Sequence, residues 1–206
     1  MANRQQVNTL PLRTITDFKS KLKGGGARPN LFEVELTFPS IVGVQDENEV
    51  LDNARFLVKA ANLPASTIAP IDIPFRGRIL KIAGDRTFET WTITVLNDVS
   101  FSIRSAFEKW MNTINKLDNA TGETDPALYQ VDAKVNQLNR DGGVLRKYIF
   151  KDVFPTNISA IDLSYETTDT LEEFTVEMQV HFYEAIKGNV SEAGGEGHQL
   201  NSKITV

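Results

Sequence analysis

Strict alternation of apolar and polar residues is the feature that most constrains how this chain folds. Between residues 172 and 184 every second residue is apolar, and the set is Phe174, Val176, Met178, Val180 and Phe182. An earlier run alternates Trp91, Ile93 and Val95 with threonines. Successive side chains of a β-strand point to opposite faces. Both runs therefore predict strands with one face in a core and one polar face.

Further alternating runs predict the remaining strands. They cover residues 32–38, 55–60, 71–75, 78–83, 132–153 and 158–166, the last with Ile161, Leu163 and Tyr165 pointing inward. Glycine supplies the positive φ that tight turns require. Short turns are therefore predicted at Arg76-Gly77, at Gly84-Asp85 and within residues 140–143, while residues 39–53 are predicted to form a long loop.

One segment changes to helical spacing. Its apolar residues recur in steps of three and four, and they are Ile103, Ala106, Phe107, Trp110, Ile114 and Leu117. This spacing predicts an amphipathic helix over about residues 100–117, capped by Asp98, Ser100 or Ser102. About nine strands and one flanking α-helix define a mainly β fold class. The expected architecture is an antiparallel β-sandwich or barrel with the helix packed on its side.

The two ends of the chain differ in composition from its centre. We predict an N-terminal arm over residues 1–27, a β-sandwich domain over 28–186 and a flexible C-terminal tail over 187–206. Residues 1–30 carry six bases and one acid, a net charge of +5, whereas the 206-residue chain carries −5. The basic arm could dock on the acidic body of a neighbouring copy, or it could be a solvated tail; the sequence leaves both open.

Composition argues against several classes of protein. The chain has no cysteine, which removes disulfides, Cys-ligated zinc and thiol nucleophiles. No apolar run approaches the length of a bilayer span, and the first residues lack the apolar centre of a signal peptide, so we expect an intracellular product without membrane anchoring. The acidic body lacks the clustered positive charge that binds nucleic acid.

Motifs for catalysis or cofactor binding are missing from the sequence. His181 and His198 are the two histidines, and they lack metal-ligand spacing. The acidic residues Asp46, Glu47, Glu49 and Asp52 lack the order of a calcium-binding loop. We therefore expect no catalytic residues, no cofactor, no metal and no enzyme activity. A glycan-binding β-sandwich module stays an alternative of another class, because Glu173 and Glu177 share one strand face.

Five segments, in order, resemble the tail tube protein of contractile-tailed bacteriophages. They are ARPNLFEVEL (27–36), ANLPAS (61–66), IAGDRTFETWTITVLND (82–98), FPTNISAIDLSYE (154–166) and LEEFTVEMQVHFYE (171–184). The helix after LND and the Asp-Gly hairpin before FPTN occur in the matching places. The resemblance covers about residues 27–186. It implies the tube-like fold shared by phage tails and secretion systems.

The resemblance also implies a role in the virion and a set of partners. Subunits would close into hexameric rings, and stacked rings would form the inner tube inside a contractile sheath. Phage DNA would pass through the tube during ejection without specific binding. The implied partners are other copies, the sheath protein, the baseplate hub or tube initiator, the tape measure and the tail terminator. The tube would be part of the virion tail, assembled in the host cytoplasm. A paralogous tube-initiating baseplate protein or a secretion-system tube protein is the nearest alternative.

Two groups of residues are predicted to lie at subunit interfaces. In related tubes the first hairpin loop reaches neighbouring subunits, so loop 39–53 with Asp46, Glu47, Glu49 and Asp52 is expected to make such contacts. Removing residues 43–52 would then block polymerisation and leave a folded monomer. The second group is Arg28, Asn30, Asp85, Arg86 and Thr87. For this second group, packing within one subunit stays open as the competing interpretation.

Overall fold

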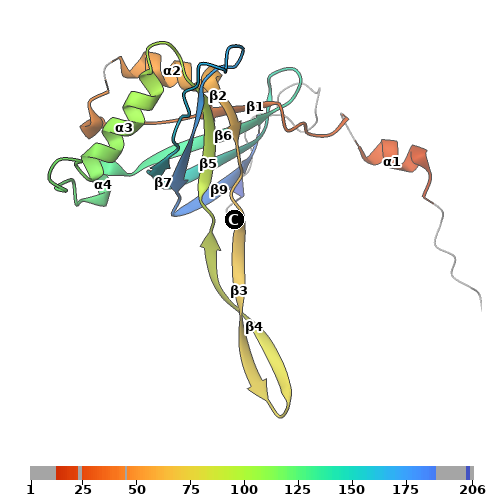
Figure 1. Ribbon diagram of the computed structural model, residues 1–206. Coiled ribbons are helices and arrows are strands. Elements are labelled where there is room, and N and C mark those ends of the chain that lie inside the picture. Colours follow the sequence, from red (N-terminus) through yellow and green to blue (C-terminus); the bar gives the residue numbers. More distant parts are fainter. Residues whose placement is uncertain (1–12, 23–24, 45, 189–202, 205–206) are drawn as a thin grey trace, which may run out of the picture.

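The computed structural model describes residues 13–22, 25–44, 46–188 and 203–204. Two antiparallel sheets share one long strand, β7 (Val144–Ile158). The first part of β7 joins β6 (Val131–Leu138), β1 (Phe32–Glu35), β9 (Phe182–Lys187) and β10 (Lys203–Ile204) in the first sheet. Its last part joins β8 (Glu173–Gln179), β5 (Trp91–Leu96) and β2 (Val58–Ala61) in the second sheet. Figure 1 shows the resulting mainly β body, as the alternating runs predict.

A bend in β7 creates the two-sheet body. Residues 146–151 of β7 pair with β9, whereas residues 154–158 pair with β8. Between these stretches Asp152 has a φ of 55°, a left-handed conformation that aspartate tolerates better than most residues. Strands commonly pass from one sheet to another at such irregularities. β8 and β9 separate at Val180 and His181, so the alternation breaks there and Phe182 is partly exposed.

The core lies between the two sheets and continues under α3 (Ser102–Ile114). Trp91, Ile93 and Val95 are fully buried, and the Trp91 ring stacks on Phe150 at 4.6 Å. On α3, the buried residues are Ile103, Ala106, Phe107 and Trp110. The N-cap position of α3 is held by Phe101, which has no side-chain cap, and the Asp98 carboxylate accepts the N–H of the first helical residue, Ser102, at 3.1 Å. Leu117 lies beyond the end of the helix and is exposed, so its predicted place on the apolar stripe is wrong.

Residues 39–57 form helices rather than the predicted loop and strand. A short 3-10 helix, Ser40–Val42, is followed by α2 (Glu47–Leu57), which packs against β1 and α3. Val50 and Ala54 are buried one turn apart, a helical step that outweighs the apparent alternation through Phe56 and Val58. Phe56 is 80% exposed. Because α2 carries core residues, removal of residues 43–52 is no longer expected to leave a folded monomer.

The segment after β7 is a loop rather than a strand. Residues 159–172 run without regular structure between β7 and β8. Leu163 and Tyr165 are exposed, contrary to the prediction that they point inward, and only Ile161 packs against the core. The alternation of this segment has no neighbouring strand to pair with among the described residues, so it does not produce a strand.

The remaining helices are short. α1 (Ile15–Lys21) begins with a capping box between Thr14 and Asp17 and gives the predicted arm a helical turn or two. α4 (Pro126–Tyr129) is a single turn near the end of α3. Most of the tail predicted over residues 187–206 lies outside the described residues. None of the helices in the described part of the chain is long and apolar enough to cross a membrane.

Candidate assembly surfaces

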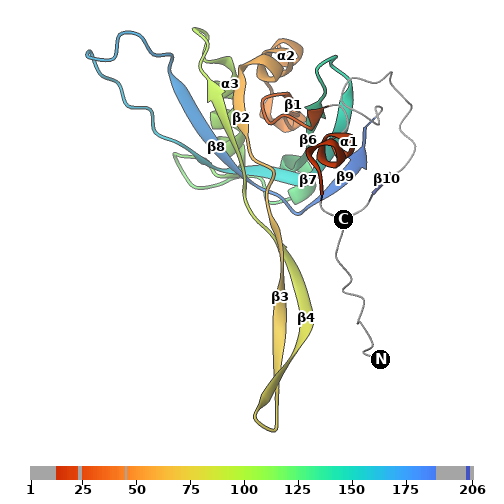
Figure 2. The ribbon, with the colours of Figure 1, turned by 90° about the vertical axis from the view of Figure 1, so that its right-hand side faces the viewer.

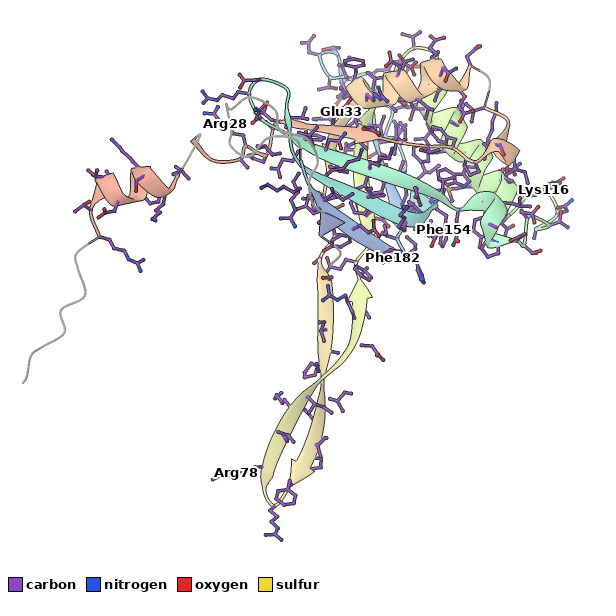
Figure 3. The ribbon with its side chains drawn as sticks, turned by 180° about the vertical axis from the view of Figure 1, so that it is seen from behind. Arg28, Glu33, Arg78, Lys116, Phe154 and Phe182 are labelled. Atoms are coloured by element: carbon purple, nitrogen blue, oxygen red, sulfur yellow. The ribbon has the colours of Figure 1, made fainter. Side chains whose placement is uncertain are left out.

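A long hairpin projects from the body into solvent. It consists of β3 (Ser66–Phe75) and β4 (Arg78–Phe88), which pair with each other and with no other strand of the described chain. Figure 2 shows it extending away from both sheets, and Figure 3 places Arg78 at its far end. Ten residues of extended strand reach about 30 Å. The hairpin therefore extends well beyond the body that carries it.

The hairpin exposes apolar side chains on both strands. They are Ile68, Ile71, Ile73, Phe75, Ile79, Leu80 and Ile82, each between 41% and 65% exposed. An isolated two-stranded hairpin is only marginally stable in water, and a contiguous apolar surface of this kind marks an interaction site. The hairpin thus has the chemistry of an element that is covered in an assembly.

Local sequence explains the shape of the hairpin. Arg76 and Gly77 both have positive φ, 47° and 81°, which gives the two-residue turn predicted from the sequence. The predicted turn at Gly84-Asp85 is wrong, because both residues lie within β4. They oppose the single residue Ala69, which makes a β-bulge. A Cβ on Gly84 would lie 2.6 Å from the Ala69 carbonyl oxygen, so the close approach requires glycine.

Two prolines limit one edge of the hairpin. Phe75 and Arg78 flank the two-residue turn and form a hydrogen-bonded pair. From this pair onward, non-hydrogen-bonded and hydrogen-bonded pairs alternate along the hairpin. Pro70 and Pro74 fall at the intervening positions, where the N–H of a residue would point outward. Proline has no N–H to donate. The outer edge of β3 is therefore poorly suited to pairing, while the outer edge of β4 keeps its donors.

The structure places Asp85, Arg86 and Thr87 at the end of the hairpin next to the body. Arg86 Nη1 lies 3.4 Å from the Ser66 hydroxyl, and the Thr87 hydroxyl lies 3.4 Å from the Thr67 carbonyl oxygen. Both contacts join the two strands of one chain. All three residues of the group are exposed, so contact with another copy is sterically open to them.

The other predicted interface residues lie far from this group. Arg28 and Asn30 are exposed in the segment before β1, and Figure 3 shows Arg28 on the side of the body from which α1 departs. Asp46 occupies the N-cap position of α2 without a side-chain capping hydrogen bond, Glu47 and Glu49 lie in the first turn, and Asp52 is exposed further along. Figure 1 shows α2 at the opposite end of the body from the hairpin. The structure therefore distributes the predicted set over three separate places.

The second sheet presents a polar face away from the core. Thr92 lies opposite Glu177, and Thr94 opposite Thr175. At the end of the sheet, Lys59 Nζ lies 2.6 Å from a Glu173 carboxylate oxygen. Glu173 and Glu177 therefore lie among threonines and a paired lysine. A glycan-binding platform is expected to have a close pair of acids or exposed aromatic side chains. Neither feature characterises the described residues of this face.

Both outer edges of the second sheet lack a partner strand. Among the described residues, β2 pairs only with β5. Residues 154–158 of β7 pair with β8 on one side, and their other side pairs with no described strand. Unpaired edges are templates for strand addition from another chain. Sequence reasoning predicted the two strands 71–75 and 78–83 and their turn, but not that this hairpin projects from the body, although apolar residues on both of its faces together with two prolines are a signal for it.

Partly buried polar contacts hold the first sheet together. Asn136 Nδ2 donates to a Glu35 carboxylate oxygen at 2.7 Å, and Lys134 Nζ lies 3.3 Å from the other oxygen. Burial opposes ionisation of Glu35, but these hydrogen bonds and the nearby lysine charges outweigh it and hold the pKa of the carboxyl below its usual value. An ion pair between Lys151 and Asp132 fixes β7 to β6. These contacts stabilise the subunit rather than form a reaction site.

Known proteins are similar to this chain in sequence and in fold. Residues 27–185 match the phage tail tube protein family. The tail tube protein gp19 of Enterobacteria phage T4 is 33% identical over 162 residues, which cover 78% of this chain and 93% of gp19.

Solved tubular assemblies have a similar fold at low sequence identity. A chain from the cap of the anti-feeding prophage, its tube-terminating cap, aligns with a TM-score of 0.57 at 15% identity, covering 79% of this chain and 91% of that one. A chain from the PVC sheath–tube complex of an extracellular contractile injection system aligns with a TM-score of 0.50 at 13% identity, covering 85% and 99%. The sequence matches, together with this fold, show that the chain belongs to the phage tail tube protein family.

Proposed function

We propose that this protein builds the inner tube of a contractile phage tail as stacked hexameric rings, and that the tube conducts DNA during ejection. The observation that carries this proposal is the second sheet, whose two outer edges differ from each other and pair with no strand among the described residues. Joining one edge to the opposite edge of the next copy is a heterologous contact. Such contacts close into rings when the rotation between copies allows it.

The polar face of the second sheet would line the channel. The core side of this sheet is filled by Trp91, Ile93 and Val95, so only the threonine-rich face can meet water in a ring. That face carries the carboxylates of Glu173 and Glu177, and one lysine, Lys59, is paired with Glu173. A net acidic wall repels DNA phosphates, whereas a basic wall would retain them. DNA would therefore slide past without specific contacts.

The hairpin would add pairing between copies. Its apolar side chains lie exposed in the isolated chain, and β4 offers an unblocked outer edge. Burial of this surface against neighbouring copies would give a favourable hydrophobic contribution to assembly. Arg28, Asn30, Asp85, Arg86 and Thr87, with the acids of α2, remain candidates for contacts at these junctions.

The proposed partners follow from a tube inside a contractile tail. A sheath protein would surround the tube, a baseplate hub or tube initiator would start it, a tape measure would occupy it and a terminator would end it. The protein would reside in the virion tail after assembly in the host cytoplasm. It would act as a structural component rather than as an enzyme.

Electron microscopy of the concentrated protein tests the proposal. We expect negatively stained samples to contain hollow rods or six-fold rings, and class averages to show one continuous wall. A sample that stays monomeric at every concentration, with an intact β-sheet signal in circular dichroism, would contradict it. The same preparation diluted below the assembly threshold serves as the monomeric control.

A further inference from the structure

We propose that α1 of one copy packs its apolar side on the segment between α3 and α4 of the adjacent copy in the same ring. The inference rests on the proposed tube, and it adds a contact across each junction between neighbouring subunits. The partner of this helix is a second copy of this chain, because each copy carries the two matching surfaces on opposite sides of its body.

α1 is an amphipathic helix whose apolar side is uncovered. Ile15, Phe18 and Leu22 follow one another in steps of three and four residues, and they are 73%, 64% and 47% exposed. A capping box between Thr14 and Asp17 fixes the start of the helix, but no residue of α1 is buried. A helix of seven residues is marginal in water by itself. It gains stability when its apolar side packs on another surface.

The chain after α1 enters the body beside the outer edge of β2. The two segments share one apolar pocket, whose lining includes Pro29, Phe32, Ala61 and Leu63. Ala61 is the last residue of β2, which pairs with β5 and with no further strand among the described residues. The proposed ring joins this edge to the end of β7 in the adjacent copy. α1 therefore leaves each copy at the junction with its neighbour.

The neighbour brings the segment between α3 and α4 to the same junction. The Tyr129 ring of α4 packs edge-on against Phe154 of β7, with ring centres 5.8 Å apart, so this segment lies beside the joining edge. The Trp110 indole N–H donates to the Tyr129 carbonyl oxygen at 2.8 Å. The Glu123 N–H donates to the Thr113 carbonyl oxygen at 3.0 Å. These bonds hold the segment against α3 as a preformed surface.

The two surfaces lie at the same level of the second sheet. Trp91 of β5 pairs with Met178 of β8, which in turn pairs with Pro155 of β7. On the other side of β5, extending the antiparallel register of β2 past Ala61 brings Leu63 level with Trp91. The pocket beside β2 also includes residues of the first sheet, and α4 contacts α3. Both surfaces therefore lie on the side of the second sheet away from the proposed channel.

The arm and the receiving segment lie on opposite sides of one copy. Figure 1 shows α1 and α4 on the two sides of the body. Figure 3 shows the same separation between Arg28, which follows α1, and Lys116, which follows α3. Each copy therefore offers its two surfaces to two different neighbours. A head-to-tail contact of this kind repeats around a closed ring.

The two surfaces match in chemistry. Leu117 and Leu128 of the receiving segment are 96% and 47% exposed, and they offer apolar contacts to Phe18. Residues 13–22 carry three bases and one acid, a net charge of +2, whereas residues 115–129 carry three acids and one base, a net charge of −2. Apolar contact supplies the affinity, and the opposite charges direct the approach of the two copies.

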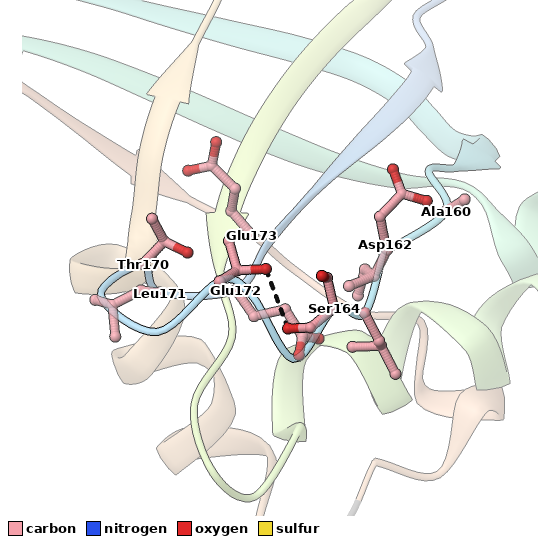
Figure 4. A pocket seen from close by; sticks show the side chains of 10 residues that line it. Ala160, Asp162, Ser164, Thr170, Leu171, Glu172 and Glu173 are labelled. Carbon is pink, nitrogen blue, oxygen red and sulfur yellow. Dashed lines mark hydrogen bonds between the residues drawn. The ribbon is translucent and has the colours of Figure 1, made fainter.

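An exposed apolar residue elsewhere provides a control position. The loop between β7 and β8 encloses a pocket of about 370 Å³, and Figure 4 shows Leu171 and Glu173 among its lining residues. Leu171 is 75% exposed. Glu173 pairs with Leu96, at the opposite end of β5 from Trp91. A cysteine at Leu171 is therefore expected to stay out of reach of α1.

Cysteine cross-linking tests the contact directly, because the chain has no cysteine of its own. Ser20→Cys with Thr124→Cys places thiols at exposed neutral positions on α1 and on the receiving segment, and keeps every charge and apolar group named above. After assembly and treatment with a short bismaleimide, we expect a ladder of linked chains on a denaturing gel. Ser20→Cys with Leu171→Cys is the control and is expected to give no ladder.

Truncation of α1 measures what the contact contributes. In Phe18→Ser we expect the threshold concentration for ring formation to rise about tenfold or more, because burial of one large apolar side chain is worth at least that factor. The melting temperature of the monomer should not change, since no residue of α1 is buried. Phe56→Ser removes a similarly exposed ring from α2 and should leave the threshold unchanged.

Light scattering, negative-stain electron microscopy and the gel separate the outcomes. Links that form only within one chain would overturn the inference, because they would place α1 on its own body. A ladder from the Leu171 control alone, or the same threshold for Phe18→Ser as for the wild type, would also overturn it. Absence of rings in the wild type would instead contradict the proposed tube.

Discussion

At the scale of single residues, Gly84 shows how one side chain controls an exposed element. Its missing Cβ lets β3 and β4 approach at the bulge opposite Ala69. The glycine therefore shapes the hairpin and not a catalytic turn. Arg86, two residues on, contacts Ser66 of the opposite strand in the same chain.

Replacing Gly84 should affect assembly more than folding. In Gly84→Ala the new methyl group would collide with the Ala69 carbonyl and distort the hairpin. We expect the melting temperature of the body to change little, because the hairpin pairs with neither sheet, while rod formation falls. Thermal unfolding and light scattering check the two effects. The neighbouring change Ala83→Val is the control, and equal rod formation by both variants would argue against this role for Gly84.

Two phenylalanines should respond oppositely to truncation. Phe150 is fully buried and stacks on Trp91, whereas Phe56 at the end of α2 is 80% exposed. Phe150→Ala is expected to lower the free energy of unfolding by about 3–5 kcal/mol. Phe56→Ala is expected to change it by less than about 0.5 kcal/mol. Urea titration of the monomer measures both free energies. Similar losses from the two variants would contradict an exposed Phe56 at the end of α2 and would favour the strand predicted over 55–60.

The Glu35 carboxylate should make stability depend on pH. Its pKa is lowered below the ordinary value of 4.5 in the folded chain, so the folded state binds fewer protons than the unfolded one. The contribution is fully present above the unfolded pKa and is lost as pH falls through the folded pKa. The difference in urea midpoint between wild type and Glu35→Gln should therefore shrink as pH falls below about 4.5. A difference that stays constant from pH 7 to pH 3 would exclude this linkage.

At the scale of secondary-structure elements, chemistry at the edges decides what can pair. Pro70 and Pro74 remove donors from the outer edge of β3, which protects the free chain from random strand addition. β4 carries no proline and keeps a regular outer edge. The second sheet likewise leaves β2 and the end of β7 open. Assembly is thus directed toward particular edges.

Blocking the outer edge of β4 should prevent this pairing. Lys81 occupies a position whose N–H points outward, opposite Asp72, to which its ammonium lies 3.4 Å away. Lys81→Pro removes both the backbone N–H and the side-chain charge. Lys81→Thr removes the charge but keeps the backbone N–H. We expect only the proline variant to lose rods in electron microscopy, with both monomers folded by circular dichroism. Normal rods from the proline variant would mean that β4 does not pair through this edge.

At the scale of the whole molecule, the subunit is stable in its body and incomplete at its hairpin. The body has a continuous core of aromatic and aliphatic side chains under α2 and α3, while the hairpin leaves its apolar residues in water. An element of this kind gains stability when other copies cover it. Assembly and ordering of the hairpin are therefore coupled, which links the fold directly to the proposed tube.

The sequence by itself determined the elements whose signals are local. Alternation specified β5 and β8, helical spacing specified α3, and Arg76-Gly77 specified the turn of the hairpin. These signals depend on the geometry of one strand, one helix or one turn, and they require no knowledge of neighbours. The family resemblance, read from five ordered segments, is confirmed by the match over residues 27–185.

Only the tertiary structure decided where local signals compete or where pairing is non-local. Residues 55–60 alternate and predict a strand, but 55–57 are the last residues of α2, and the packing of Val50 and Ala54 selects the helix. The alternation over residues 158–166 finds no partner strand in the described part of the chain, so the segment after Ile158 is a loop. Gly84 resembles a turn residue until its opposite strand is known. The physical reason is the same in each case: a backbone hydrogen bond or a buried side chain needs a partner distant in sequence, and the fold supplies or withholds it.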